Sequence, residues 1–122
     1  MTKLAYYTPL ELTDTLGLWR DNINSALGLA RFAAVLAKSA DYTLAQDADV
    51  VVCDATGGAF TITLPASPST GDTYAIIKKD SSVNAVTIGG NGKLINGAST
   101  ASLASQYATK RVVYTGSEWL II

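Results

Sequence analysis

Short β-strand patterns separated by turn-forming residues fill residues 41–122, and they constrain the fold more than any other feature of this chain. Each pattern is a few apolar or β-branched residues long and is bounded by Gly, Pro, Asn or Ser. Dense turn signals between short strands are typical of antiparallel sandwiches and small barrels. We therefore expect a mainly β protein whose residues 39–122 form a small antiparallel β-sandwich or barrel-like domain. The patterns begin near Tyr42, Asp49, Phe60, Gly71, Ala85, Leu94 and Gly116.

Several turns can be assigned from residue type alone. Gly57-Gly58 separates two strand patterns as the turn of a hairpin would. Pro65 ends the pattern at residues 60–64, because proline has no N–H to donate to a strand ladder. The runs 89–92 and 96–97 contain Gly and Asn, which adopt positive φ angles at little cost.

The strand patterns differ in how their apolar residues are arranged. Residues 61–64 alternate Thr with Ile or Leu, so Ile62 and Leu64 should share one face. The runs 50–53, 76–77 and 120–122 are continuously apolar, as expected for strands that are covered on both faces. The C-terminal run from Trp119 to Ile122 should be a core strand of its own domain; the alternative is that it pairs along an edge with a neighbouring chain.

Residues 1–38 have a different character and are expected to form an arm and a helix for attachment and oligomerisation. Pro9 disfavours helix at the preceding residue, so residues 1–12 should be extended. Thr13 or Asp14 can cap a helix N-terminus. Apolar residues then recur at helical spacing and should form one stripe that packs on the β-domain or on copies of itself. The stripe consists of Leu12, Leu16, Trp19, Ile23 and Leu27.

The segment 29–40 is compatible with two structures. Its Ala and Leu residues favour continuation of the helix. Gly28 favours a break, after which the segment would begin the β-region as a strand.

Composition favours subunit contacts and argues against nucleic-acid binding. The chain of 122 residues is 48% hydrophobic and only 16% charged, which suits a homo-oligomer whose interfaces bury extra surface. The net charge is −1 and no basic face is visible, whereas nucleic-acid binding needs one. The pairs Lys78-Lys79 and Lys110-Arg111 are expected to be solvated strand ends.

The sequence offers little for catalysis, so we expect no enzyme, no cofactor and no metal. It has no histidine, and the single Cys53 in an apolar strand is expected to be a buried structural thiol. Residues 89–93 lack the Ser or Thr of a phosphate loop and should form a turn. Asp47 and Asp49 lack the further ligands of a calcium loop and should lie in a solvated turn.

No targeting or membrane segment is expected. The start of the chain has no apolar region long enough for a signal peptide. The Ala- and Leu-rich residues 26–37 contain Arg31 and fall short of the ~20 residues that span a bilayer. The chain is therefore predicted to be made in a cytoplasm, without a membrane partner.

Aromatic residues are the remaining candidates for ligand contacts. Tyr74, Tyr107, Tyr114 and Trp119 lie in or beside strand patterns, where core packing is the main expectation and sugar stacking the alternative. Tyr6 and Tyr7 lie in the N-terminal arm, outside any hydrophobic period, and are better candidates for contacts with a protein partner.

The strand patterns, taken in order from Tyr42 to the C-terminus, resemble the small β-domain of bacteriophage virion proteins found in tail fibres, head fibres and capsid decoration proteins. Residues 14–24, with Asp14-Thr15, Trp19 and Asn24, resemble a short element near the virion-attached end of phage fibre proteins. The resemblance covers about two thirds of the chain.

This resemblance implies a non-enzymatic structural protein of the virion, assembled in the host cytoplasm. The leading interpretation is a homotrimeric capsid decoration or head-fibre protein that contacts other virion proteins through residues 1–38. The alternative is a short tail fibre or adaptor whose β-domain binds a host carbohydrate or receptor.

Overall fold

The computed structural model describes residues 33–122, which form one compact unit, Ala33–Ile122. These residues are mainly β, as predicted, and contain no helix. The predicted arm and helix lie outside the described residues. The strands are β1 (Val35–Lys38), β2 (Tyr42–Thr43), β3 (Val50–Cys53), β4 (Phe60–Thr63), β5 (Thr73–Lys78), β6 (Val86–Gly89), β7 (Thr100–Leu103), β8 (Thr109–Tyr114) and β9 (Trp119–Ile121).

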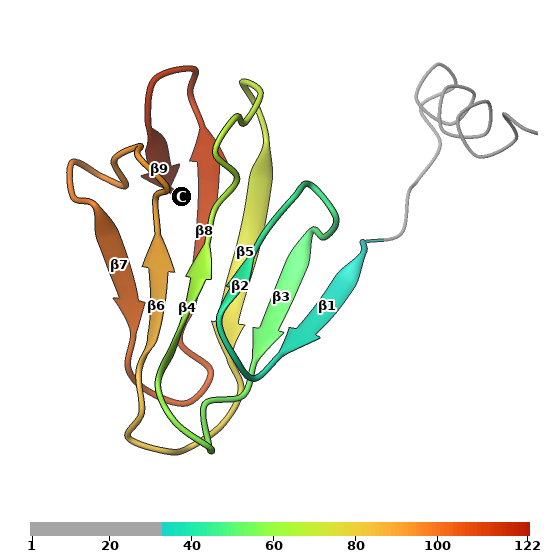
Figure 1. Ribbon diagram of the computed structural model, residues 1–122, viewed down its shortest axis with the longest axis vertical. Helices are drawn as coiled ribbons and strands as arrows, with labels where there is room; N and C mark the ends of the chain where they lie inside the picture. Colours follow the sequence, from blue (N-terminus) through green and yellow to red (C-terminus); the bar gives the residue numbers. More distant parts are fainter. Residues whose placement is uncertain (1–32) are drawn as a thin grey trace, which may run out of the picture. The chain divides into compact units, whose positions relative to one another are not determined.

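The strands form two sheets that face each other (Figure 1). The five-stranded sheet has the order β1-β3-β5-β8-β9, and the four-stranded sheet has the order β2-β4-β6-β7. The first six strands therefore alternate between the sheets along the chain, so that this part of the chain winds as a coil. Each turn of the coil adds one strand to each sheet.

This winding makes the sheets mixed, which corrects the predicted antiparallel architecture. Strands β1, β3 and β5 run parallel to one another, as do β2, β4 and β6. Only the later pairs, β5 with β8, β8 with β9 and β6 with β7, are antiparallel. A chain that crosses to the opposite sheet after every strand returns to the first sheet in the same direction, so its neighbours there are parallel.

The prediction of a hairpin at Gly57-Gly58 is wrong for the same reason. The strand before this turn, β3, belongs to the five-stranded sheet, and the strand after it, β4, belongs to the four-stranded sheet. The turn is closed by the N–H of Gly58, which donates to the carbonyl of Ala55 over 3.0 Å. Gly57 and Gly58 thus lie in an arch that connects the two sheets. Glycine favours such an arch and a hairpin turn alike, so residue type alone does not distinguish them.

The core lies between the sheets and follows the strand period of two. Ile62 and Leu64 both point inward and are fully buried, as predicted. The buried Trp119 in β9 lies between two tyrosines, with ring centroids 5.8 Å from Tyr74 and 5.2 Å from Tyr114. The prediction that the C-terminal run is a core strand is confirmed, although Leu120 faces outward.

Residues 35–38 are a strand, which decides part of the ambiguous segment 29–40. Strand β1 pairs in parallel with β3, in the register Val35 with Val50 and Lys38 with Cys53. The compact unit Ala33–Ile122, which we call the β-unit, therefore includes residues 33–38, although the sequence pattern places them in the N-terminal region 1–38.

Candidate functional site

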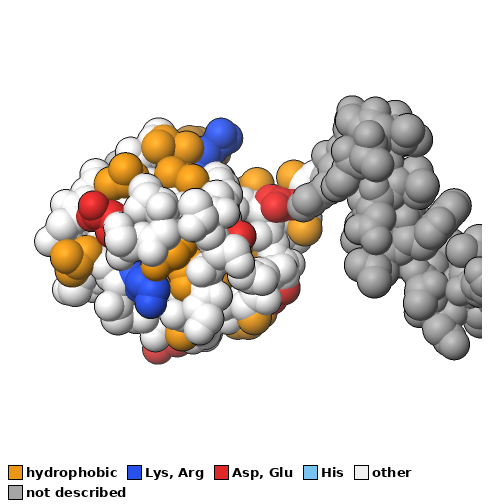
Figure 2. Space-filling model, turned by 90° about the horizontal axis from the view of Figure 1, so that it is seen from above, with side chains coloured by type: hydrophobic (Ala, Val, Ile, Leu, Met, Phe, Trp, Pro, Cys, Tyr) orange, Lys and Arg blue, Asp and Glu red, His pale blue; other side chains and the backbone are white. Residues whose placement is uncertain are grey.

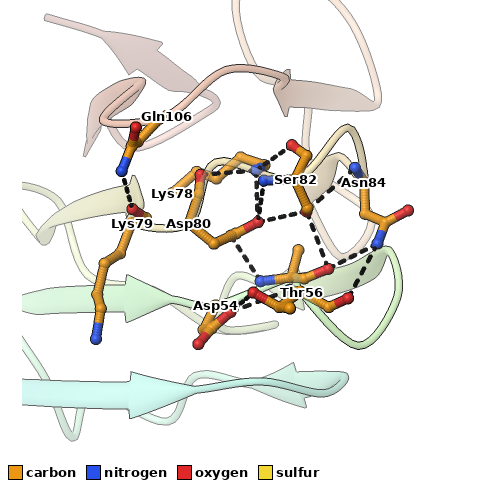
Figure 3. Close-up of polar contacts among 9 residues, drawn as sticks. Asp54, Thr56, Lys78, Lys79, Asp80, Ser82, Asn84 and Gln106 are labelled. Carbon is orange, nitrogen blue, oxygen red and sulfur yellow. Dashed lines mark hydrogen bonds and ion pairs between the residues drawn. The ribbon is translucent and has the colours of Figure 1, made fainter.

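An ion pair is buried at one end of the sandwich, where β5 ends. Lys78 is fully buried, and its Nζ lies 2.8 Å from Oδ2 of Asp80. Figure 3 shows the two side chains between the loop that follows β3 and the loop that follows β5. A buried charged pair of this kind is the first place to look for chemistry, because burial and neighbouring charge change proton affinity.

Asp80 is saturated with hydrogen-bond donors. Its carboxylate accepts bonds from the backbone N–H of Ala55 (2.7 Å) and of Ser82 (3.0 Å), from the Ser82 hydroxyl and from Lys78. Burial alone would raise the pKa of Asp80, but the bonds from Lys78, Ser82 and Ala55 outweigh it and hold the pKa well below its ordinary value. Asp80 is therefore a charged acceptor, unsuited to act as a general acid near neutral pH.

Lys78 is equally saturated. Its Nζ also donates to the carbonyl of Asp80 over 3.0 Å and to the carbonyl of Ser82 over 2.8 Å. An ammonium group has three protons, and these three acceptors use all of them. The arrangement leaves no free amine for nucleophilic chemistry. It instead fixes the loop after β5.

The same network fastens the loop after β5 to the loop after β3. The Asn84 side-chain amide donates to the carbonyl of Ala55 over 2.8 Å, and the Ser82 hydroxyl oxygen lies 3.2 Å from the same carbonyl (Figure 3). Asp54 accepts bonds from the hydroxyl and the N–H of Thr56, which hold the pKa of Asp54 below its ordinary value. We interpret this cluster as a structural clamp between the two loops. It consists of Asp54, Ala55, Thr56, Lys78, Asp80, Ser82 and Asn84.

The clamp corrects the prediction that Lys78-Lys79 is a solvated strand end. Lys79 is exposed, but Lys78 occupies the inward position after Tyr74 and Ile76 in β5. The spacing of two from Tyr74 and Ile76 indicated that Lys78 would point inward. The prediction followed the residue type instead, because lysine is rarely buried without a partner. In the other pair, Arg111 is exposed and Lys110 is half-buried.

Cys53 is fully buried beside this network, as predicted for a structural thiol. Burial, together with the nearby charge of Asp80, raises the pKa of Cys53 to about 12. A thiol held in its neutral form is a poor nucleophile and a poor metal ligand.

Asp47 lies in the loop between β2 and β3 and is exposed, as predicted. It accepts a hydrogen bond from the Tyr42 hydroxyl, which holds the pKa of Asp47 below its ordinary value. The Nζ of Lys38 lies 3.8 Å from the centre of the Tyr42 ring. Within residues 33–122, no group of three or more potential metal-binding side chains comes together.

The aromatic candidates separate into core and surface residues. Tyr74, Tyr114 and Trp119 are buried, so their rings are unavailable for stacking on a sugar. Tyr107 is 66% exposed and has a positive φ angle of 64°. It is the single described aromatic residue with a mostly exposed ring.

A shallow, open hollow of about 300 Å³ lies between the turn after β1 and the arch after β3. Small residues dominate its lining. Its one carboxylate, Asp41, accepts a hydrogen bond from the N–H of Thr61 over 2.8 Å, which ties the turn to β4. The hollow offers neither depth nor converging polar groups for a small-molecule site.

The outward face of the five-stranded sheet is largely apolar, and we call it the apolar face. The register aligns Val35 with Val50 and Ala75, and Ala37 with Val52 and Ile77, in two rows across β1, β3 and β5. Val113 and Leu120 extend the face onto β8 and β9. All of these side chains are partly or mostly exposed.

The outward face of the four-stranded sheet is polar but uncharged, and we call it the threonine face. Its strands align hydroxyl residues in rows, and each of these side chains is at least partly exposed. The face consists of Thr43, Thr61, Thr63, Thr87, Thr100 and Ser102, with Gly89. The two outer faces of one sandwich thus differ sharply in polarity, although both contain strand-favouring residues.

Charges are sparse on the end of the unit seen in Figure 2, where Lys, Arg, Asp and Glu side chains are scattered among uncharged ones. No helix within the described part of the chain is long and apolar enough to cross a membrane.

The residues predicted for oligomerisation and attachment lie outside the described residues. They are Tyr6, Tyr7, Leu12, Leu16, Trp19, Ile23 and Leu27. The apolar face was not predicted as a site. The continuous apolar runs 50–53 and 76–77 could have indicated it, because a strand with apolar residues on both sides has an apolar outward face.

No protein-family model matches this chain, and no match was found among curated proteins.

Proposed function

We propose that this chain is a non-enzymatic structural protein of a bacteriophage virion, a homotrimeric capsid decoration or head-fibre protein that assembles by burying surface. The observation that supports the proposal best is the apolar face. Parallel strands normally have both faces covered, yet the outward side chains of β3 and β5 are uncovered within the described residues. A second copy of the chain is the occupant that we propose for this face.

The scarcity of charged side chains on the apolar face suits contact between copies of the chain. Arg111 is the one charged side chain aligned with the rows of the apolar face, opposite Ala75. Loss of charge at the centre of a patch is the compositional feature that distinguishes protein interfaces from other surface. The threonine face lacks this apolar character and is left to face solvent.

The apolar face is too small to form a standard protein interface alone. Strands spaced about 4.8 Å apart and rising about 3.3 Å per residue give a five-stranded sheet a face of roughly 300–500 Å². A standard interface buries about 800 Å² per partner. The N-terminal stripe from Leu12 to Leu27 is proposed to supply the remainder, as a helix that contributes to the same oligomer.

The saturated clamp at Lys78 and Asp80 supports a structural function over a catalytic one. Its donors and acceptors satisfy each other, and its effect is to fasten two loops. The neutral, buried Cys53 adds no reactive group.

A matched pair of variants tests the oligomer. Val52→Lys places a charge on the apolar face, and Thr87→Lys places the same charge on the threonine face. Both positions are partly exposed strand residues, so both variants should fold. By sedimentation equilibrium the full-length chain and Thr87→Lys should be trimeric, whereas Val52→Lys should dissociate. If both variants remain trimeric, the apolar face is not the interface.

The virion assignment has its own test. Purified full-length chain should bind to phage particles that lack this protein, and Trp19→Ala should bind less well because it removes a large anchor from the attachment stripe. If the wild-type chain binds neither capsids nor tails, the virion assignment fails, whatever the oligomeric state.

The alternative, a tail fibre or adaptor that binds carbohydrate, is favoured by one observation: the exposed ring of Tyr107. Stacking on such a ring is a common mode of ligand contact for aromatic residues. A glycan array separates the two functions, with Tyr107→Ala as the control. Specific binding that is lost in this variant would favour recognition.

A further inference from the structure

Two Asn-Gly turns of the same type lie close together in the loop between β6 and β7. Asn91 and Gly92 have φ angles of 54° and 88°, and Asn96 and Gly97 have φ angles of 49° and 85°. Positive φ at both central residues is the signature of a type I′ turn. Each turn is closed by a backbone bond, from Lys93 to Gly90 over 3.1 Å and from Ala98 to Ile95 over 3.0 Å.

We propose that Asn96 is a site of spontaneous self-modification and that Asn91 is protected from the same reaction. In this reaction the backbone nitrogen of the following glycine loses its proton and attacks Cγ of the asparagine. A new N–Cγ bond forms, the Cγ–Nδ2 bond breaks, and ammonia leaves. Water then opens the cyclic imide, and the product is aspartate or isoaspartate.

The attacking nitrogen is equivalent in the two turns. Within residues 33–122, neither the N–H of Gly92 nor that of Gly97 makes a hydrogen bond. Both glycines also have no atom within 4 Å of the position that a Cβ would take, so both turns are open to solvent on that side. The attacking groups therefore do not distinguish the two turns, and the asparagine side chains do.

The two asparagine side chains are bound through opposite ends of their amides. The N–H of Ile121 donates to Oδ1 of Asn96 over 2.9 Å. Asn91 instead donates from Nδ2 to the carbonyl of Leu64 over 3.0 Å. The partners fix both orientations, because an N–H needs an acceptor and a carbonyl needs a donor.

This difference favours reaction at Asn96. When the glycine nitrogen attacks, negative charge develops on Oδ1, and the Ile121 N–H is already aimed at that atom, as a donor in an oxyanion hole would be. The leaving Nδ2 of Asn96 is unbound among the described residues. At Asn91 the leaving nitrogen is held by Leu64, and Oδ1 has no donor within the same residues.

The position of Asn96 gives the reaction a structural consequence. The segment around it covers the outer edge of β9: Trp119 donates to the carbonyl of Leu94 over 2.8 Å, and Asn96 donates from its N–H to the carbonyl of Trp119 over 2.9 Å. Isoaspartate lengthens the backbone by one carbon, so this register cannot be kept. The product also adds a negative charge. The edge of β9 should therefore loosen as the protein ages.

Peptide mapping by mass spectrometry, after incubation of the full-length protein at mildly alkaline pH, tests the proposal. The peptide that contains Asn96 should be converted at least about fivefold faster than the one that contains Asn91. This factor is well below the ~10²–10³ of a buried oxyanion-hole donor, because the turn is exposed. In the urea-unfolded chain the two rates should converge. Equal rates in the folded protein, faster reaction at Asn91, or conversion only after unfolding would each overturn the proposal.

Three variants test whether ammonia is lost from Asn96 and whether the N–H of Ile121 speeds that loss. Asn96→Gln should abolish release of ammonia from the folded protein at early times, and Asn91→Gln should leave it unchanged. Ile121→Pro removes the N–H that faces Asn96 and should slow conversion at Asn96 toward the rate of Asn91. Tryptophan fluorescence, measured in a Trp19→Phe background so that Trp119 is the one tryptophan, checks that Trp119 remains buried in this variant. An unchanged rate in a folded Ile121→Pro chain would show that the donor has no effect.

Discussion

Lys78, the last residue of β5, and Asp80, in the loop that follows, form an ion pair of 2.8 Å with side chains that are 0% and 5% exposed. The strand period of two places Lys78 on the inner side, after Tyr74 and Ile76, and the loop after β5 brings Asp80 back to it. Burial of a charged pair costs free energy unless further hydrogen bonds satisfy both groups. Here the loops after β3 and β5 provide those bonds, so the stability of the pair and the order of the two loops depend on each other.

Lys78→Met should destabilise the protein strongly, because it leaves the Asp80 carboxylate buried without its counter-ion. We expect the midpoint of thermal unfolding to fall by at least about 10 °C, since each kcal/mol is worth about 4–8 °C in a domain of 60–100 residues. Circular dichroism melts measure this. Lys79→Met, at the exposed neighbour, is the matched control and should change the midpoint little. The double variant Lys78→Met/Asp80→Asn should recover part of the loss; a further loss would contradict the pairing.

Stability should decline as the pH falls below about 4. The pKa of Asp80 is lower in the folded protein than the ordinary value of about 3.9, so the unfolded chain binds its proton first. The stabilisation is therefore complete above about pH 4 and is lost as the pH falls toward the lower folded pKa. Asp47 and Asp54 have shifts in the same direction. Urea unfolding of Asp80→Asn across pH 2–5 should show a flatter slope than wild type; identical slopes would exclude Asp80 as a contributor.

Cys53 should resist thiol reagents in the folded protein and react only on unfolding, because it is fully buried and its pKa is raised to about 12. The same shift makes stability fall as the pH rises from about 8.5, the ordinary thiol value, toward 12. Tyr74, with its pKa raised to about 12, adds a similar loss that begins near pH 10. Cys53→Ala should therefore remove the decline between about pH 8.5 and 10. Rapid labelling of the native protein would contradict the buried assignment.

A fragment that starts at Ala33 should fold as an independent β-unit, whereas one that starts at Ser39 should be less stable. The shorter fragment lacks β1, whose pairing covers one edge of β3 and whose Leu36 packs against the core. Thermal melts of the two fragments measure the difference. If our attachment hypothesis is right, the longer fragment should nevertheless fail to join phage particles that lack the protein. Binding as strong as that of the full-length chain would place attachment in the β-unit.

Local patterns predicted the features that depend on a strand's own period. Ile62 and Leu64 were assigned to one face, and Trp119 to a core strand, because alternation and apolar content are properties of the strand itself. The turns at residues 89–92 and 96–97 were likewise assigned from Asn and Gly, which adopt the positive φ angles found there.

The candidate site was harder to predict because it depends on partners distant in sequence. Lys78 was expected in solvent; it is buried because Asp80 and the loop containing Ser82 fold back to satisfy its ammonium group. The donor that faces Asn96 comes from Ile121, 25 residues away along the chain. No local pattern contains such a contact.

Short strands with turns between them could be assigned to residues 41–122 from local patterns, since β-propensity, side-chain alternation and turn chemistry act within a few residues. The crossing between sheets at Gly57-Gly58, which makes β3 and β5 parallel, depends instead on how the two sheets pack together. Glycine permits a hairpin and an arch equally well. The choice between them is made by the burial of both inner faces in one core, a free energy that belongs to the whole unit and to no single turn.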